Sequence, residues 1–441
     1  MSAEKLNIVV VGAGIAGLTA AYTLQKTGCE VRVLEAQQDP GGRMRQLTLQ
    51  GLQVNSGARL LYTFYSTVME LVEELGLEDE IQTLPNTELL CEDGNNTFPV
   101  SFVPEFSMLF KPGISLSQRF GLLSLIPDLV RSRLMTDPDD LGTCEFADSE
   151  NMESYLSRKV GSEFVGKYIE PLFRGARSWN AEDISPAFFL STSAHIPGHR
   201  AFTFRKGIGY LCESLAEKLN IRYGIEVNKI ERLANSTGVK LTYQENGAVR
   251  DLQADIVVCA TEGAKIAELV SDMNAEEAGF AEKIRYNSLG VVYHVLKESP
   301  QHAITFYTAD HPSPHAIIEA VPKRNTLPHL FCELTPESID NVKKQNKQAS
   351  MAELTMEATR KLYPMLDVEI DYSINQWIEH MLPIFYPGYI SEMNKFVLKQ
   401  ETTAQRIYYC GDYLSQALVG GACSSGKRVA ETIIKHYPQS K

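Results

Sequence analysis

The sequence has no apolar run long enough to cross a bilayer, no CxxC cysteine pair and no excess of basic residues. None of its apolar stretches approaches the roughly 20 residues that a membrane-spanning helix requires. Acidic residues outnumber basic ones, 55 against 42, and the net charge of -13 argues against a nucleic-acid partner. Internal repeats and low-complexity tracts are also missing. These absences leave a globular enzyme or binding protein, for which 44% hydrophobic residues is ordinary.

The eight cysteines are scattered along the chain, and no His/Cys spacing typical of a metal centre occurs. His195 and His199 are four residues apart, but Pro197 and Gly198 interrupt any helix between them. We therefore expect no metal site. The first apolar strand begins within a few residues of Met1, which leaves no room for an export signal, so we expect reduced thiols and a cytoplasmic location.

The strongest pattern lies in the first 43 residues. An apolar, β-branched run over 7–11 leads into Gly12-Ala-Gly-Ile-Ala-Gly17, and a helix of small and apolar residues follows. A second strand then ends in Glu35, 18 residues after Gly17. Strand, glycine turn, helix, strand and acid in this order predict a Rossmann-like site for an ADP-containing dinucleotide.

Each position of this turn has a physical role. Gly12 permits the tight turn, Gly14 lets the backbone approach a pyrophosphate, and Gly17 lets the helix pack closely on the strand. The diphosphate is expected at the helix N-terminus, where free N–H groups and the helix dipole favour an anion. Glu35 can accept hydrogen bonds from ribose hydroxyls and disfavours a 2′-phosphate, which makes NADP an unsuitable ligand.

The rest of the chain alternates between α/β and helical character, and its 441 residues are enough for two or three domains. We expect an α/β fold with a discontinuous dinucleotide-binding domain, formed by residues 1–85, 205–265 and 400–441. A substrate domain is expected from residues 86–204 and 266–399, with a mixed sheet and a helical insertion over 105–204. Within the first domain, the pattern predicts an amphipathic helix over 66–77 and a single strand over 221–227.

Residues 8–43, Val227, 255–260 and 410–426 resemble the superfamily of FAD-dependent amine oxidases, protoporphyrinogen oxidases and phytoene desaturases. The resemblance covers nearly the whole chain. Its spacers are most similar to the protoporphyrinogen-oxidase-like branch, including 171–175, 204–209 and 286–292. It implies FAD as the cofactor and a Rossmann-like FAD-binding domain.

The resemblance also implies roles for particular residues. Gly42 and Arg43 would contact the diphosphate and ribityl region, Val227 would contact the adenine through its backbone, and Asp412 would hold an oxygen of the flavin side chain. The complete set expected at the cofactor is Gly12, Ala13, Gly14, Ile15, Ala16, Gly17, Glu35, Ala36, Gly42, Arg43, Gly57, Ala58, Arg59, Leu60, Val227, Gly411, Asp412, Val419, Gly420 and Gly421. Independently of the resemblance, a helix beginning near Gly421 would point its positive end at the flavin N1–C2=O region, where negative charge develops on reduction.

Two positions depart from the amine-oxidase pattern. Many members place a lysine near flavin N5, but here the corresponding position falls near Val291, and Lys297 is too far along the strand. Some members attach FAD through a C-terminal cysteine, yet neither Cys410 nor Cys423 stands at that position, so we expect non-covalent FAD.

The flavin performs the oxidative step in this chemistry, so no catalytic triad of side chains is expected and the catalytic residues are left unknown. Trp377 and Tyr389 stand where the family places aromatic walls beside the ring, the alternative being core positions. Arg59 faces either the flavin or the substrate, or forms a surface pair. His294 and Tyr293 are expected in the core or at the surface.

Residues 120–130 form an apolar, amphipathic segment. Such helices in relatives rest on a membrane surface or cover the substrate channel, but the segment lacks a Lys/Arg-rich face, so a packed helical subdomain is favoured over a membrane surface.

The sequence therefore predicts an oxidase that transfers hydride from an amine of small or medium size to FAD, with dioxygen as acceptor. The alternative is ring or C–C dehydrogenation, as in porphyrinogen oxidation or polyene desaturation, with a quinone as a further acceptor. A third, remote alternative is a non-catalytic flavin-binding scaffold. The oligomeric state is unknown from the sequence.

Overall fold

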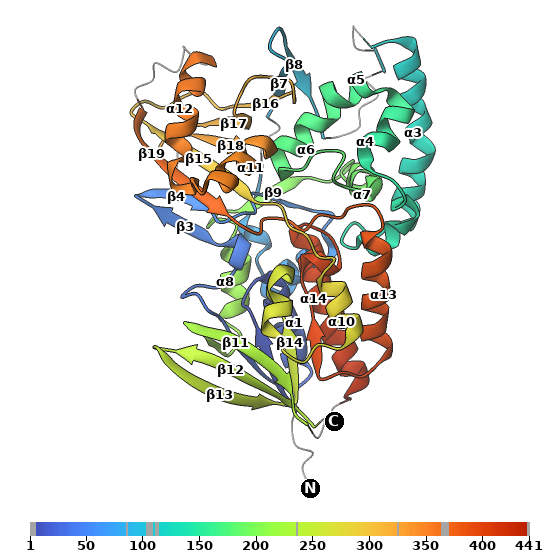
Figure 1. Cartoon of the computed structure of the whole chain (residues 1–441), viewed down its shortest axis with the longest axis vertical. Helices are drawn as coiled ribbons and strands as arrows, with labels where there is room; N and C mark the ends of the chain where they lie inside the picture. Colours follow the sequence, from blue (N-terminus) through green and yellow to red (C-terminus); the bar gives the residue numbers. More distant parts are fainter. Residues whose placement is uncertain are drawn as a thin grey trace.

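The computed structural model describes residues 6–84, 87–102, 109–110, 114–234, 237–323, 326–362 and 370–438. It has a parallel sheet, a seven-stranded mixed sheet and a group of helices beside them (Figure 1). This confirms the expected fold class. The domain boundary expected at residues 85 and 86 lies outside the described residues.

The parallel sheet collects strands from distant parts of the chain. Its order is β10 (Ile221–Arg222), β2 (Glu30–Leu34), β1 (Asn7–Val11), β14 (Ile256–Cys259) and β20 (Ile407–Tyr409). Residues of the central strands are buried on both faces, which is why these strands are continuous apolar runs. Because all five strands are parallel, their carboxyl ends meet at one edge, where ligands bind in such sheets.

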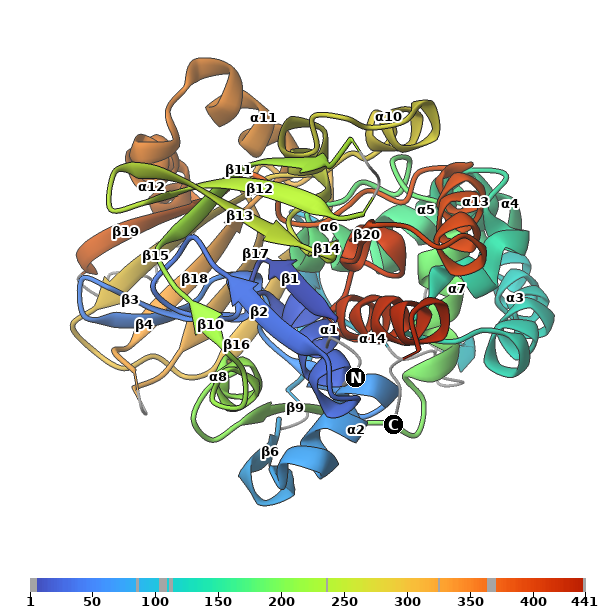
Figure 2. The same cartoon turned by 90° about the horizontal axis from the view of Figure 1, so that it is seen from below.

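Two layers cover this sheet. On one face lie α1 (Ile15–Lys26) and α14 (Val419–His436), side by side in Figure 2, with α2 (Ser66–Leu75) and α8 (Tyr210–Ala216) nearby. On the other face lie β11 (Ile225–Arg232), β12 (Val239–Glu245) and β13 (Ala248–Ala254), together with α9 (Ile266–Leu269), α10 (Ala275–Ala281) and α13 (Tyr389–Thr402). The strand expected over 221–227 is in fact two, because Gly224, with φ of +66°, turns the chain between the sheets.

The seven-stranded sheet has the order β19 (Ile370–Ile378), β15 (Leu289–Leu296), β18 (His329–Leu334), β17 (His315–Val321), β16 (Ala303–Tyr307), β7 (Leu89–Glu92) and β8 (Thr97–Val100). Helices α11 (Pro336–Gln345) and α12 (Met351–Leu362) cover one face. The hairpin of β3 (Gln46–Leu49) and β4 (Leu52–Asn55) packs on the opposite face. Along each central strand, the side chains therefore alternate between the face covered by α11 and α12 and the face covered by β3 and β4.

The helices beside the sheets are α3 (Leu116–Met135), α4 (Met152–Val160), α5 (Ser162–Phe164), α6 (Glu170–Arg177) and α7 (Pro186–His195). The helical insertion expected over 105–204 is wrong at its end, since β9 (Ala201–Phe204) is a strand that pairs with β5 (Leu61–Tyr62) and β6 (Ile81–Thr83).

Helix α3 contains the apolar segment singled out in the sequence. A capping box at Ser115 and Gln118 begins it, and Gly121 and Leu125 are buried against the neighbouring helices. The opposite side is exposed and apolar, with Leu116, Phe120 and Val130 among its residues. Within the described residues, no helix combines the length and apolar content needed to cross a membrane.

Candidate active site

A large cavity of about 2310 Å³ joins the two sheets. One end is lined by the carboxyl edge of the parallel sheet and the other by the face of the seven-stranded sheet that carries β3 and β4. Pockets for drug-sized ligands measure about 300–1,000 Å³. The cavity therefore has room for a dinucleotide and a second molecule.

Backbone packing explains the glycines of the first turn. Gly12 has φ of +105°, and a Cβ there would lie 2.8 Å from the Ala260 carbonyl oxygen. A Cβ on Gly17 would lie 2.1 Å from the Gly12 carbonyl oxygen. Gly14, which lines the cavity, has open space where its Cβ would be. Gly12 and Gly17 are thus required by the fold, and Gly14 leaves its backbone accessible to a ligand.

The Glu35 carboxylate is hydrogen-bonded to this turn. Its carboxylate accepts hydrogen bonds from the backbone N–H of Ala13 at 2.6 Å and of Gln37 at 2.9 Å. Both Glu35 and Ala36 line the cavity at the end of β2. The carboxylate expected at a ribose therefore lies beside the N-terminus of α1.

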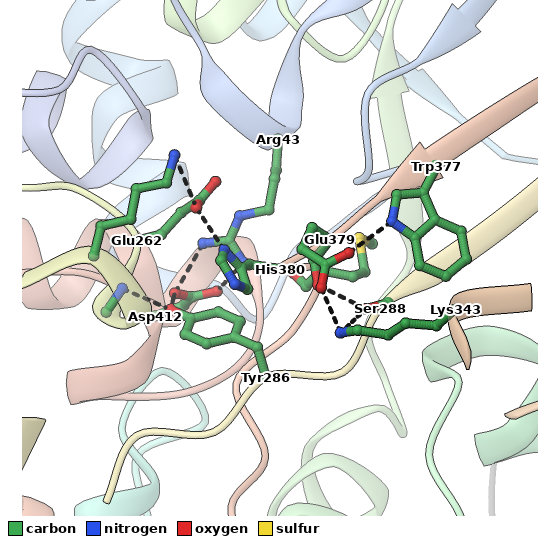
Figure 3. A network of polar contacts seen from close by, with 12 residues as sticks. Arg43, Glu262, Tyr286, Ser288, Lys343, Trp377, Glu379, His380 and Asp412 are labelled. Carbon is green, nitrogen blue, oxygen red and sulfur yellow. Dashed lines mark hydrogen bonds and ion pairs between the residues drawn. The ribbon is translucent and has the colours of Figure 1, made fainter. Parts of the chain in front are cut away.

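Arg43 joins the N-terminal and C-terminal parts of the chain (Figure 3). Its guanidinium donates to both Asp412 carboxylate oxygens, at 2.6 and 3.0 Å, and to the Met381 carbonyl at 2.6 Å. Tyr286 Oη lies 3.5 Å from the same carboxylate. Burial acts to lower the pKa of Arg43, but Asp412 outweighs it and raises that pKa. The pair stays charged and holds residues 369 positions apart together.

A second pair lies at the same end of the cavity. His380 and Glu262 are hydrogen-bonded through Nδ1 and Oε2 at 2.9 Å (Figure 3). Burial tends to raise the pKa of Glu262, but His380 and nearby cations lower it overall. Glu262 lines the cavity, so this carboxylate is ionised beside the carboxyl end of β14.

The start of α14 is packed too tightly for side chains. A Cβ on Gly420 would lie 2.0 Å from Asp139 Oδ1, and one on Gly421 would lie 2.3 Å from the Gln416 carbonyl oxygen. Val419, in contrast, lines the cavity. The first turn of α14 is therefore held close to Asp139 and Gln416 while its cavity side is open.

The expected cofactor residues fall into two groups. Those that line the cavity are Gly12, Gly14, Ile15, Ala16, Glu35, Ala36, Gly42, Arg43, Gly57, Ala58, Arg59, Leu60, Val227, Gly411, Asp412 and Val419. Ala13, Gly17, Gly420 and Gly421 are instead packing or backbone hydrogen-bonding positions next to it. The structure thus brings segments from both ends and the middle of the chain to one cavity.

The other end of the cavity has an apolar wall with a few polar groups. The apolar lining comes from Leu289, Val291, Tyr293, Ile304, Phe306, Ile317, Val321 and Phe331. Arg59 stacks over the Phe331 ring at 4.0 Å and forms an ion pair with Glu319. His302 contacts the same Glu319 at 3.0 Å. Arg59 therefore forms its ion pair inside the cavity, beside the apolar wall.

Glu333 is a further polar group of this wall that the sequence did not reveal. It is 5% exposed, lines the cavity and accepts a hydrogen bond from Ser178 Oγ at 2.8 Å. Burial raises its pKa to about 7, although Ser178, Arg59 and Arg177 oppose the shift. A lone carboxylate within the apolar strand 329–334 was the only sequence signal. Tyr293, expected in the core or at the surface, also lines this wall and donates to Gln376 at 2.8 Å.

Of the two expected aromatic walls, Trp377 lines the cavity and Tyr389 does not. Trp377 lines the cavity, but its indole packs toward the other face of the sheet, near Met351. The indole N–H donates to Glu379 at 2.8 Å. Figure 3 shows the indole N–H directed at Glu379. Tyr389 is 1% exposed and donates to the Tyr413 carbonyl at 2.9 Å. Helix packing thus places the Tyr389 ring in the core, whereas Trp377 is half-buried on the edge strand β19.

Val291 faces the cavity, where the family pattern would have a lysine. Among the described residues that line the cavity, the one lysine is Lys265, which pairs with Glu262 at 3.5 Å near β14. Lys297 follows the end of β15. A lysine at the apolar wall is therefore missing from the described part of the chain.

The histidines have structural contacts. His195 Nδ1 contacts the Ser191 carbonyl at 2.8 Å, and His199 Nδ1 contacts Thr63 at 3.2 Å. His294 is buried, bonds to Ser373 at 2.8 Å and has a pKa lowered by burial to about 4. No cluster of three or more His, Cys, Asp or Glu suited to a metal occurs in the described ranges.

Among known proteins, two curated relatives are protoporphyrinogen oxidases. Protoporphyrinogen oxidase 2, chloroplastic/mitochondrial, of Arabidopsis thaliana is 22% identical over 98% of this chain and 94% of its own length. The mitochondrial protoporphyrinogen oxidase of Nicotiana tabacum is 27% identical over 41% of this chain, and the match spans only 34% of that protein.

Solved structures of two amine oxidases have the same fold. Putrescine oxidase, in its wild-type form bound to putrescine, superposes with a TM-score of 0.74 at 16% identity, covering 98% of this chain and 99% of that one. Cyclohexylamine oxidase from Brevibacterium oxydans IH-35A gives a TM-score of 0.73 at 16% identity, with the same coverage.

A Rossmann-like glycine turn that opens onto a cavity with an apolar wall is typical of dinucleotide-dependent oxidoreductases. The model of the family described as "Flavin containing amine oxidoreductase" matches residues 15–434, and the chain belongs to this family.

Proposed function

We propose that the cavity binds one FAD non-covalently and that the protein oxidises a small-molecule amine. The observation that carries this proposal is that the glycine turn, Glu35, the Arg43–Asp412 pair and the start of α14 all border one cavity that continues to the face of the seven-stranded sheet. When bound, FAD supplies the hydride acceptor.

The residues present fit an extended dinucleotide. The N-terminus of α1 and the open space at Gly14 suit a diphosphate, and Glu35 suits ribose hydroxyls. Val227, Asp412 and Val419 all line the cavity, and we assign Val227 to the adenine side and the other two to the flavin side. Cys410 and Cys423 are fully buried, and burial raises the pKa of both thiols, which supports non-covalent attachment.

The apolar wall suits an amine substrate. Glu333 places a carboxylate beside Tyr293, so an ammonium group can be held against this aromatic ring. Glu333, with its pKa near 7, can also accept the proton that an ammonium must lose before hydride transfer. Dioxygen is the proposed acceptor.

Ring or C–C dehydrogenation is the second candidate. Val291 in place of a lysine, the cavity volume, and two guanidinium groups that can bind carboxylates, on Arg59 and Arg177, favour it. The full-length similarity to a protoporphyrinogen oxidase also supports it. A quinone or dioxygen would accept the electrons.

Anaerobic reduction of the flavin by a substrate panel tests the proposal. We expect bleaching by one or more amines and an imine or aldehyde as product. Bleaching by porphyrinogens or polyenes alone would favour the second candidate. Protein that is colourless and takes up no FAD would contradict the proposal, and flavin that no substrate bleaches would favour a non-catalytic scaffold.

Glu35→Ala tests the cofactor site. Loss of charge-assisted hydrogen bonds should weaken FAD binding by about 1–3 kcal/mol, measured by fluorescence titration of the apoprotein. Glu226→Gln, at a carboxylate that lines the same end of the cavity, is the matched control and should bind as wild type. Equal affinities of all three proteins would rule out the ribose role of Glu35.

A further inference from the structure

Asp139 is a buried carboxyl group at the junction of two helix N-termini. It lies after α3 and is 0% exposed. Its Oδ2 accepts from Ser66 Oγ at 3.2 Å and from the Thr67 N–H at 3.4 Å, in the first turn of α2. Its other oxygen, Oδ1, faces Gly420 in the first turn of α14.

That second oxygen is without a hydrogen-bond partner among the described residues. An unpaired carboxylate oxygen in the interior is costly, and the cost disappears if the group holds a proton or if a donor reaches it. The first hydrogen bond within α14 runs from the Ala422 N–H to the Leu418 carbonyl. Asp139 therefore lies beside the first turn of the helix, whose backbone N–H groups have no partner within the helix.

The segment that carries Asp139 is fixed to the C-terminal part of the chain. Ser415 Oγ donates to the Asp139 carbonyl at 2.6 Å, and the Leu141 N–H donates to the Ser415 carbonyl at 3.0 Å. Asp140 forms an ion pair with Arg428 at 2.5 Å. The backbone at Asp139 is therefore held beside the segment that leads into α14.

The same helix end opens onto the cavity. Leu418 and Val419 line it, as does Tyr65, whose ring packs on Gly420 next to Asp139. A charge on Asp139 therefore acts on the end of α14 that would point at the flavin. An ionised Asp139 cancels part of the positive potential of this helix end, and a protonated Asp139 restores it.

We propose that Asp139 is a proton-linked positioning residue, which sets how strongly the site favours reduced over oxidised FAD. The inference rests on the proposed FAD site. Hydride transfer delivers two electrons and one hydrogen nucleus, which adds one negative charge to the cofactor. Asp139 then takes up one solvent proton at its carboxylate, so the site gains two electrons and two protons and no net charge.

Other charged groups face this position and influence its proton. Burial raises the pKa of Asp139 to about 7, and Asp137 acts in the same direction, while the Thr67 and Ser66 donors oppose it. Tyr65 and Cys423 are the further titratable neighbours, and burial raises the pKa of each. The Asp140–Arg428 pair contributes opposite charges that largely cancel.

Redox titration of the FAD-loaded protein across pH 5.5–8.5, roughly a unit and a half either side of the pKa of Asp139, tests the proposal. Asp139→Asn should remove the change of slope near neutral pH. At pH values above that change, we expect Asp139→Asn to raise the ratio of the affinity for reduced FAD to the affinity for oxidised FAD about tenfold. For a two-electron couple this corresponds to a rise of about 30 mV in the potential. Asp128→Asn, at a carboxylate of α3 paired with Lys159, is the control and should titrate as wild type.

Infrared difference spectra of the wild type, oxidised against reduced at pH 8, provide a measurement that needs no variant. We expect a carbonyl band of a protonated carboxylic acid to form on reduction. Parallel potential–pH curves for wild type and Asp139→Asn, or no such band, would overturn the inference while the proposed function stands. A protein that binds no FAD would overturn both.

Discussion

The two ends of the cavity are built in different ways. At the dinucleotide end, backbone conformation decides the structure, since Gly12 and Gly17 are glycines because other backbone atoms occupy the space of a side chain. At the other end, side chains from four neighbouring strands form an apolar wall around Arg59 and Glu333. The first end defines a cofactor class, while the second determines which substrate fits.

The difference explains why the family is evident and the substrate is not. A backbone site tolerates few sequences, so its glycines recur at fixed spacing. A wall of side chains keeps its strand structure through many substitutions. Val291, at the position where the family pattern has a lysine, illustrates this. The following changes are ordered from the largest expected effect to the smallest, and each tests one side of this comparison.

Asp412→Ala should have the largest effect, because it leaves the Arg43 guanidinium without its carboxylate between two distant chain segments. We expect a loss of about 3–5 kcal/mol in the free energy of unfolding, measured by urea denaturation. Glu357→Ala, which removes an exposed pair on α12, is the control and should leave the unfolding midpoint unchanged. A small loss at Asp412 would mean that the backbone alone holds the dinucleotide end.

Gly17→Ala tests whether the backbone decides this end. The added Cβ meets the Gly12 carbonyl, so α1 must move away from β1 at a cost of about 2–3 kcal/mol. Thermal unfolding and FAD titration should both show the loss. Gly279→Ala, in α10 where a Cβ has open space, should not destabilise the protein, and equal effects of the two changes would refute the packing argument.

Glu333→Gln tests the side-chain end through pH. Because the folded pKa of Glu333 lies above its unfolded value, the carboxyl stabilises the fold below about pH 4.5, relative to higher pH, and this contribution is lost as the pH rises through about 7. The glutamine variant does not undergo that loss, so it should be more stable than wild type at pH 8 by about 3 kcal/mol and equal to it at pH 4.5. Urea denaturation at both pH values measures this, with Glu353→Gln, on the exposed side of α12, as control. The same destabilisation at both pH values would show that Glu333 is a permanently neutral hydrogen-bond acceptor.

Trp377→Phe should have the smallest effect. It removes one hydrogen bond to Glu379 behind the sheet, at about 1 kcal/mol of stability. The rate of flavin reduction by a substrate should change less than twofold, whereas Gln376→Leu, one residue earlier and on the cavity face, should change it more. The reverse order would restore Trp377 to the substrate wall.

The strands, the helices and most of the positions that line the dinucleotide end of the cavity could be predicted because periodicity and glycine spacing are local properties. The orientation of Trp377 could not, since it depends on the register of β19 against β15, where Trp377 pairs with Gly290. Tyr389 was misplaced because its helix packs by α10, far from it in sequence. Asp139 carried no sequence signal, and Glu333 carried only that of a lone carboxylate in an apolar strand, since burial among distant residues gives both their chemistry.

The central strand β1 pairs with β14, and β14 pairs with β20, about 400 residues after β1 begins. During synthesis the first strand therefore emerges long before its sheet can be completed. The glycine turn and Glu35 are made first, but Asp412 and α14 reach them only when nearly the whole chain has left the ribosome. Such long-range pairing slows folding and leaves apolar strand edges exposed meanwhile. We therefore expect cofactor uptake to be one of the last events in maturation. We also expect that a chaperone, and not added flavin, would stabilise a chain that stops before β20.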